Sequence, residues 1–523
     1  MTPEAFASRV QKLGHQLLVA PRSTSFLSQQ NLRQKLFDRM LANPQFRTAM
    51  LRFTDVAPVL DDDTDFMSHL QAYFEAEGGV EGWLGKATGL GKWLSGAAAP
   101  VVRAQIRQMA QSFIAGESLA AALPNLHLLH QHGILSSVDL LGEAVLTQAE
   151  ADGFTASYHE AIKGLAHHMQ TWAPSQAPEF DRLGNIARAN VSVKLSALYH
   201  HLKVADHDRV VGVLVERLSQ ILDTAMAHNA YVHIDAEQYQ LLPLTMEVFA
   251  KTLLQAKYLS YPHVGIVLQA YLKDAEPRLK GLLKLAKDRG TPFSIRLVKG
   301  AYWDYEQALA ERQNWPCPVF DHKAETDANF ERLTDLLLGA FPLVRPCIGS
   351  HNARTLAVAI ATAEKYGLDK ADVEFQMLYG MAEHYRDAVR DLGYRVRQYC
   401  PLGAFIPGMS YLVRRLLENT ANQSFLAQAQ QPDTDERLLA PPAIPPTVPK
   451  PTLPFYNRAP VDWAHAPQRQ RAIKALQKFA KSAPWRIPPA VNGKDYAPKA
   501  VDVHKHYCPW LMSLEVSHTI PAS

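Results

Sequence analysis

Apolar residues recur at helical spacing through the N-terminal part of the chain. The stretch FDRMLANPQFRTAMLRF, residues 37–53, places them three and four positions apart, and VRAQIRQMAQSFI, residues 102–114, repeats the pattern. Each stretch therefore has one apolar face, as expected of helices that pack against a core. The sequence predicts a helical region over residues 1–130.

From residue 133 onward, short apolar segments suited to strands alternate with longer segments suited to helices. Parallel strands need crossover connections of this length, and a chain of such units is typical of a (β/α)8 barrel. An open doubly wound sheet is the alternative, but no dinucleotide-binding glycine pattern follows the first strand. We predict a distorted (β/α)8 (TIM) barrel over residues 131–430, with strands in the segments 133–143, 191–198, 231–238, 265–272, 293–302, 347–352, 373–380 and 394–403.

Many of these predicted strands end in polar residues. The C-terminal ends of the strands form the active-site face of a (β/α)8 barrel, so polar groups from separate strands meet there. The sequence therefore predicts one site formed by Asp139, Glu143, Lys194, Asp235, Glu237, Gln269, Arg296, Lys299, His351, Asn352, Gln376 and Arg397.

Several cations among the predicted site residues indicate an anionic ligand. Arg414 and Arg415 are adjacent on a predicted helix that also has to bury leucines, and two guanidinium groups match a carboxylate well. Lys194 would add a third cation, although a solvated basic patch is an open alternative. Asp235 would be costly to bury without a partner, and Arg296 is a natural one; a purely structural ion pair in the barrel mouth explains this pair equally well.

The C-terminal part changes in composition. Residues 440–454 read APPAIPPTVPKPTLP, which predicts an extended linker within 431–454, and residues 455–523 hold one predicted helix and a short tail.

With 47% hydrophobic residues, 20% charged residues and a net charge of +3, the chain has the composition of a globular protein without a nucleic-acid footprint. The sequence has no run of membrane-span length, no signal-peptide pattern and no cysteine spacing typical of a metal site. We expect a cytoplasmic protein, and peripheral membrane contact stays open.

Six motifs in order resemble the proline dehydrogenase domain of bifunctional proline utilization A flavoproteins. They are SVKLSAL, IDAE, RLVKGAYWD, SHNA, EFQMLYGM and YLVRRLLEN, within a resemblance that runs from about residue 70 to about residue 430. The resemblance implies a distorted (β/α)8 barrel that holds FAD at the C-terminal ends of its strands. It also implies oxidation of L-proline to 1-pyrroline-5-carboxylate by hydride transfer from C5 to the flavin N5.

The resemblance also implies roles for individual residues. Lys194, Asp235 and Arg296 are the expected catalytic residues, and Glu143 is expected to pair with Arg415 to gate the site. The residues expected to contact FAD are Asp235, Gln269, Arg296, Lys299, Gly300, Trp303, Thr326, His351, Asn352 and Glu418. Those expected to contact proline are Lys194, Asp235, Ala301, Tyr302, Leu378, Tyr399, Arg414 and Arg415.

The family further implies a membrane quinone as electron acceptor, and with it peripheral membrane association. Residues 455–477 resemble the connector to an aldehyde dehydrogenase domain and VNGKDYA resembles the first strand of that domain, but the segments that would carry its chemistry do not follow. We therefore expect a separate 1-pyrroline-5-carboxylate dehydrogenase as partner and, because no basic ribbon–helix–helix segment is present, no nucleic-acid partner. The alternative hypothesis is a non-catalytic remnant that binds FAD or proline without turnover.

Overall fold

The structure is a computed structural model of the 523-residue chain. It divides into two compact units, residues 1–312 with 316–454, and residues 313–315 with 455–523. The residues that it describes are 1–20, 43, 45, 48–49, 52–53, 56–57, 60, 62–74, 99–100, 103, 113–142, 145–404, 435–446, 458–482, 485–486, 490–491, 494–495, 504–508 and 511–519.

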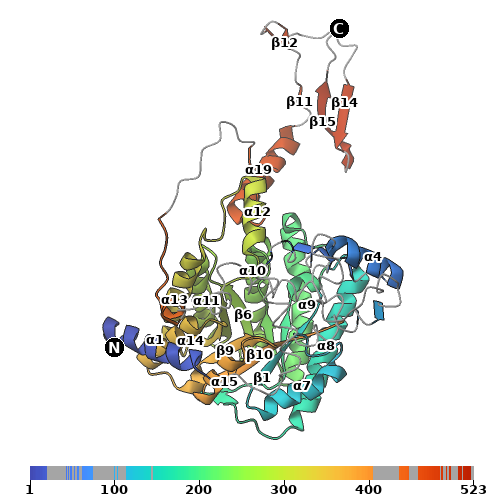
Figure 1. Cartoon of the computed structure of the whole chain (residues 1–523). Helices are drawn as coiled ribbons and strands as arrows, with labels where there is room; N and C mark the ends of the chain where they lie inside the picture. Colours follow the sequence, from blue (N-terminus) through green and yellow to red (C-terminus); the bar gives the residue numbers. More distant parts are fainter. Residues whose placement is uncertain are drawn as a thin grey trace. The chain divides into compact units, whose positions relative to one another are not determined.

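A closed barrel of parallel strands forms the centre of the first unit (Figure 1). The strands follow one another around the barrel in chain order, and pairing of the first strand with the last closes the ring. The predicted (β/α)8 fold is confirmed, and each of the eight predicted segments overlaps one strand. They are β1 (Leu135–Leu140), β4 (Asn190–Val193), β5 (Tyr231–Ile234), β6 (Val264–Gln269), β7 (Ser294–Val298), β8 (Arg345–Gly349), β9 (Glu374–Leu378) and β10 (Arg395–Leu402).

Helices surround the barrel, and local sequence signals set several of their ends. Thr147 and Glu150 form a capping box at the start of the first helix after β1, and Gly290, with a φ of 77°, ends the helix between β6 and β7. The apolar helix after β8 is buried along nearly its whole length. The surrounding helices are α8 (Gln148–Gln170), α9 (His207–Ala227), α10 (Leu242–Leu253), α11 (Ala275–Arg289), α12 (Trp303–Gln313), α13 (Lys323–Gly339), α14 (Ala353–Lys365) and α15 (Glu383–Asp391).

The N-terminal end of the barrel encloses a network of buried ion pairs. Glu374 accepts hydrogen bonds from Arg395 Nε at 3.0 Å and Arg397 Nε at 2.7 Å. Asp181 lies in a short hairpin formed by β2 (Phe180–Asp181) and β3 (Gly184–Asn185), and it accepts a hydrogen bond from Arg345 Nε at 2.9 Å. These groups fill the barrel interior where its strands begin.

Two residues of the predicted site therefore belong to this end of the barrel. Gln376 and Arg397 line a small cavity together with residues at the starts of β4, β5, β7 and β8. Placing them at the C-terminal mouth was wrong, because β10 continues to Leu402 and Arg397 is only its third residue.

Helices from both ends of the first unit pack together on α14. Helix α1 (Pro3–Leu18) contacts α14 and α18 (Asp435–Leu439), and Arg9 makes a bidentate ion pair with Glu364. Gln11 Nε2 and Arg354 Nη1 both donate to the Leu439 carbonyl, at 3.2 and 2.7 Å.

The other described helices of the N-terminal region are α4 (Asp63–Phe74) and α7 (Leu119–Gln131). Most of the two stretches that predicted this region lie outside the described residues.

The second unit contains the helix predicted after the linker and several strands, of which the sequence predicted only one, at VNGKDYA. Helix α19 spans Ala466–Ser482, and Trp315 Nε1 donates to the Pro460 carbonyl at 2.8 Å. Strand β15 (Leu511–Thr519) lies between β11 (Trp485–Arg486) and β14 (His504–Cys508), and β12 (Ala490–Val491) pairs with β13 (Lys494–Asp495).

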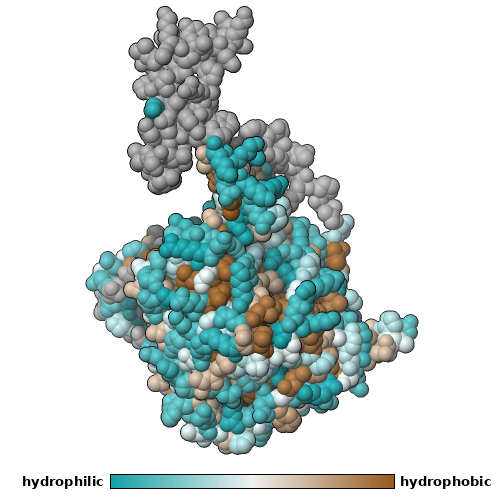
Figure 2. Space-filling model, turned by 180° about the vertical axis from the view of Figure 1, so that it is seen from behind, coloured by the Kyte–Doolittle hydropathy of each residue, from teal (hydrophilic) through white to brown (hydrophobic). Residues whose placement is uncertain are grey.

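The surface of the described residues contains both hydrophilic and hydrophobic side chains. Figure 2 shows hydrophilic residues over most of the face turned to the viewer, with hydrophobic residues in separate areas between them. Within the described part of the chain, no helix has the length and apolar character needed to cross a membrane.

Candidate functional site

A buried cluster of charged side chains lies at the C-terminal mouth of the barrel. Lys194 and Asp235 directly follow β4 and β5, whereas Arg296 and Tyr399 lie within β7 and β10. Asp235 accepts hydrogen bonds from Arg296 Nη1 at 3.0 Å and from the Tyr399 hydroxyl at 2.6 Å. Lys194 Nζ lies 3.6 Å from Asp235 Oδ2 and 3.3 Å from the Tyr399 hydroxyl. Asp235 thus contacts three other predicted site residues, each from a different strand.

A second carboxylate completes this cluster. Asp139, near the end of β1, forms an ion pair with Lys194 and is fully buried. The sequence placed Asp139 among the polar strand ends but assigned it no role. Its signal was a carboxylate inside the otherwise apolar stretch VDLL, which needs a buried partner. We call Asp139, Lys194, Asp235, Arg296 and Tyr399 the mouth cluster.

Hydroxyl groups support the mouth cluster from within the barrel. Arg296 Nη2 donates to Ser192 Oγ at 3.2 Å, and Ser192 Oγ lies 3.3 Å from Ser137 Oγ. Ser137 in turn donates to Asn190 Oδ1 at 2.7 Å. Because these residues are buried, the network holds the Arg296 side chain in one orientation. Neither serine was predicted from the sequence, because both carry no signal apart from alternation along their strands.

A second group of predicted residues lies just beyond the end of β7. Lys299 Nζ donates to Asp327 of α13 at 2.5 Å, and burial lowers the pKa of Lys299 against the opposing effect of that carboxylate. Gly300 has a φ of 133°, and a Cβ there would lie 2.5 Å from the Tyr271 ring. Trp303 starts α12 and donates from Nε1 to the Phe320 carbonyl at 2.8 Å. A side chain at position 300 is therefore excluded by both the backbone conformation and the space.

Two adjacent predicted residues follow β8. His351 Nε2 accepts a hydrogen bond from the Leu378 backbone at 2.9 Å, which joins the ends of β8 and β9. Asn352 Oδ1 caps α14 by accepting from Thr355 N at 2.9 Å. Both side chains thus have a structural role at the mouth, whatever they bind besides. Glu237, buried after β5, accepts a hydrogen bond from Ser196 N at 3.1 Å, and its carbonyl accepts one from Gln269 Nε2 at 3.2 Å. The remaining predicted residues in the described part are Gln269 at the end of β6, half-buried Ala301 and Tyr302 after β7, and buried Thr326 on α13.

Four predicted residues cannot be placed against this geometry. Glu143, Arg414, Arg415 and Glu418 lie outside the described residues. The proposed gate and the two-arginine clamp therefore stay predictions.

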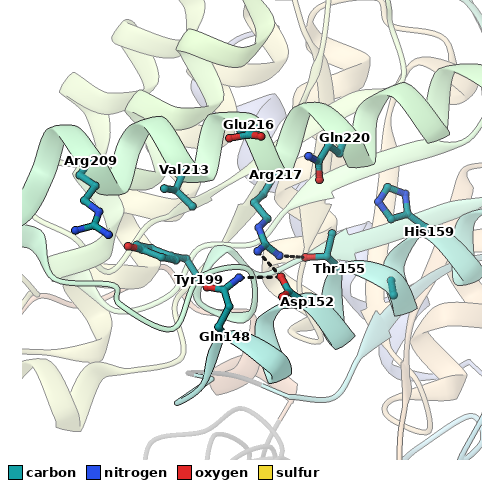
Figure 3. A pocket seen from close by; sticks show the side chains of 11 residues that line it. Gln148, Asp152, Thr155, His159, Tyr199, Arg209, Val213, Glu216, Arg217 and Gln220 are labelled. Atoms are coloured by element: carbon teal, nitrogen blue, oxygen red, sulfur yellow. Dashed lines mark hydrogen bonds and ion pairs between the residues drawn. The ribbon is translucent and has the colours of Figure 1, made fainter.

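A separate groove lies between α8 and α9 on the outside of the barrel. It has a volume of about 660 Å³, and its lining includes Tyr199, Arg209 and Glu216. Figure 3 shows Arg217 reaching across it to Asp152 and Thr155, so its central charges are paired with each other. None of the predicted site residues lines this groove.

Two family profiles match the chain. The proline dehydrogenase profile matches residues 122–428, and that of the proline utilization A N-terminal domain matches residues 7–113. The bifunctional protein PutA of Escherichia coli is 34% identical over 328 residues, which is 61% of this chain and 24% of that protein. Proline dehydrogenase 1 of Bacillus subtilis is 27% identical over 319 residues, which is 61% of this chain and 89% of that protein.

Solved structures of proline utilization A proteins are also similar to the chain. Proline utilization A from Bdellovibrio bacteriovorus, inactivated by N-propargylglycine, superposes with a TM-score of 0.88 at 35% identity. That alignment covers 100% of this chain and 53% of the other. Proline utilization A from Bradyrhizobium japonicum superposes with a TM-score of 0.69 at 27% identity, over 94% of this chain and 52% of the other. The chain thus spans about half the length of these proteins.

Proposed function

Because the chain belongs to the proline dehydrogenase family, we propose that it oxidises L-proline to 1-pyrroline-5-carboxylate with FAD as cofactor, the first step of proline breakdown to glutamate. The observation that carries the proposal is the mouth cluster. It places two cations and two carboxylates, all buried, at the face where (β/α)8 enzymes hold their active sites. Such groups are costly to bury for stability alone.

In this proposal Lys194 binds the carboxylate of proline. Its ammonium group is held by Asp139 and lies within 3.6 Å of Asp235, so its position is fixed before the substrate arrives. When the carboxylate of proline is held at a fixed point, the small rigid ring attached to it also has a fixed orientation. Positioning of this kind supplies much of the rate acceleration in enzymes. Arg414 and Arg415 are proposed to complete the carboxylate site, and Ala301, Tyr302, Leu378 and Tyr399 to line it.

The residues around β6 and β7 are suited to a flavin. Gln269 Oε1 and Arg296 Nε are buried and have no hydrogen-bond partner in the described part of the chain, so each has bonding capacity left for a polar ligand. We propose that Gln269, Arg296, Lys299, Gly300 and Trp303 hold FAD from this side. His351, Asn352, Thr326 and Glu418 are proposed as further contacts.

The reaction removes two electrons from proline. A hydride leaves C5, a proton leaves the ring nitrogen, and a carbon–nitrogen double bond forms between them. When bound, FAD supplies the acceptor for the hydride. Arg296 contributes a fixed positive charge, because Asp235 and Ser192 hold its guanidinium group by hydrogen bonds.

We propose that the electrons pass on to a membrane quinone and that the protein is cytoplasmic, with peripheral contact at the membrane. A separate 1-pyrroline-5-carboxylate dehydrogenase is the proposed consumer of the product. These parts of the proposal rest on the family and not on the mouth cluster.

The test is anaerobic titration of the purified protein with L-proline. We expect a yellow protein whose flavin absorbance near 450 nm bleaches with L-proline, and loses that response after incubation with N-propargylglycine. A yellow protein that stays oxidised with L-proline would instead support the non-catalytic alternative. A colourless protein that takes up no added FAD would refute both hypotheses.

A further inference from the structure

Asp139 has an unusual environment for a carboxylate. Its side chain is fully buried, and one oxygen, Oδ1, accepts a hydrogen bond from Lys194 Nζ. The other oxygen, Oδ2, has no hydrogen-bond partner in the part of the chain that the structure describes. A buried carboxylate oxygen without a donor is costly while it carries charge, and the cost falls if that oxygen holds a proton.

The groups around Asp139 come from several elements of the barrel. Lys194 is contributed by the end of β4, Asp235 by the end of β5, Tyr399 by β10 and Tyr158 by α8. Arg296 of β7 lies behind Asp235. Within this described set the charges balance, with two cations against two carboxylates. A ligand carboxylate at Lys194 would give the set an excess negative charge.

The proton is most easily accepted at Asp139. Burial raises the pKa of Asp139 and Asp235 adds to the shift, whereas Lys194 and the nearby Tyr399 hydroxyl oppose it. When a second carboxylate shares the positive charge of Lys194, the interaction that keeps Asp139 charged weakens, so the pKa of Asp139 rises further. Both oxygens of Asp235, by contrast, already accept hydrogen bonds, one from Arg296 and one from Tyr399.

We propose that Asp139 positions Lys194 and takes up a proton at Oδ2 when a ligand carboxylate binds to that lysine. The proposal rests on the proposed function, which supplies proline as the carboxylate, and it adds a proton-holding residue to that site. The proton then offsets the charge of the bound anion, so the mouth cluster and the anion together carry the same total charge as the free cluster. Between the pKa of Asp139 in the free protein and its pKa in the complex, affinity falls up to tenfold for each unit that the pH rises.

The experiment is isothermal titration calorimetry of the oxidised holoprotein. The probe is tetrahydrofuran-2-carboxylate, in which an ether oxygen replaces the ring nitrogen of proline, so the ligand brings no proton of its own. Titrations in phosphate and in Tris at one pH give the number of protons taken up, because the two buffers differ in ionisation enthalpy. We expect net proton uptake by the unaltered protein and an affinity that falls as pH rises.

Asp139→Asn is the decisive variant, because its amide mimics the protonated carboxyl. We expect no proton uptake and a pH-independent affinity, whereas Asp139→Glu should recover uptake with a shifted midpoint. A merely structural anchor would instead weaken binding in Asp139→Asn equally at every pH. Asp152→Asn, which removes an exposed carboxylate on α8, is the control and should take up protons as the unaltered protein does.

Two results would overturn the proposal: probe binding without proton uptake in the unaltered protein, or undiminished uptake in Asp139→Asn. If the asparagine variant does not fold, Asp139→Glu decides, since an unshifted pH dependence there contradicts the role of this residue. Flavin bleaching by L-proline without proton uptake would refute the role of Asp139 alone. Proton uptake without bleaching would refute the proposed oxidation alone.

Discussion

The buried ion network at the N-terminal end of the barrel makes a strong prediction about stability. Glu374→Gln removes the carboxylate that lies between Arg395 and Arg397, while keeping its size. Arg395 and Arg397 are both 1% exposed, so neither guanidinium group can turn to water for compensation. Removing one partner of a buried pair typically costs about 3–5 kcal/mol.

The pKa of Glu374 gives a second route to the magnitude. Burial acts to raise this pKa, but the two arginines and Gln376 lower it from 4.5 to about 2. At about 1.4 kcal/mol for each pH unit, the charged carboxylate contributes about 3 kcal/mol to folding near neutral pH. Because the folded-state pKa lies below the unfolded value, the contribution is present above pH 4.5 and is lost as pH falls toward 2.

The assay is urea unfolding followed by circular dichroism. At pH 7 we expect the free energy of unfolding of Glu374→Gln to be about 3 kcal/mol below that of the unaltered protein. At pH 3 the gap should narrow to less than half. Asp288→Asn, which breaks an exposed pair with Lys284 on α11, is the control and should cost less than about 0.5 kcal/mol. A loss below about 1 kcal/mol for Glu374→Gln, or a gap that is constant with pH, would refute the reasoning.

Three further predictions concern the mouth of the barrel. Asp235→Ala leaves Arg296 without its carboxylate and should lower kcat/KM for L-proline by about 100-fold or more; an unchanged value would exclude Asp235 from the site. Gly300→Ala should destabilise the protein by about 2 kcal/mol in thermal unfolding, because of its φ and its contact with Tyr271, whereas Gly281→Ala, with open space around it, should not. Lys299→Met should weaken FAD binding about tenfold in a flavin-release titration, and full flavin retention through dialysis would contradict the assignment of Lys299 to the cofactor.

The barrel could be predicted from the sequence because each strand leaves a local signal. Segments such as GIVLQAYL are apolar apart from one polar residue, Gln269, as expected of strands covered on both faces, and the intervening helices are long enough for parallel crossovers. The short hairpin that brings Asp181 to Arg345 leaves no such signal. It consists of two strands of two residues each, and long-range ion pairs hold it in place.

The candidate site could be predicted only in part, because the sequence shows local patterns but not which distant residues meet. Asp235 and Arg296 stood out because a charge within an apolar strand needs a partner, and the structure pairs them. Arg397 gave the same signal but lies at the opposite end of the barrel, since sequence pattern does not fix where a strand begins. Asp139 was recognised as a polar strand end, yet its partner Lys194 is 55 positions away, and only the closed ring brings them together.

The way α1 and α18 meet on α14 has a consequence for engineering. The Leu439 carbonyl accepts a hydrogen bond from Gln11, so the end of α18 lies against the middle of α1, about 12 Å of helix rise from Pro3. A short glycine-rich bridge could therefore join the two ends, and new termini could be opened in an exposed loop elsewhere. A circularly permuted barrel of this kind would keep the contacts of α1 with α14 and α18. A fused reporter or partner enzyme could then be attached at the new termini.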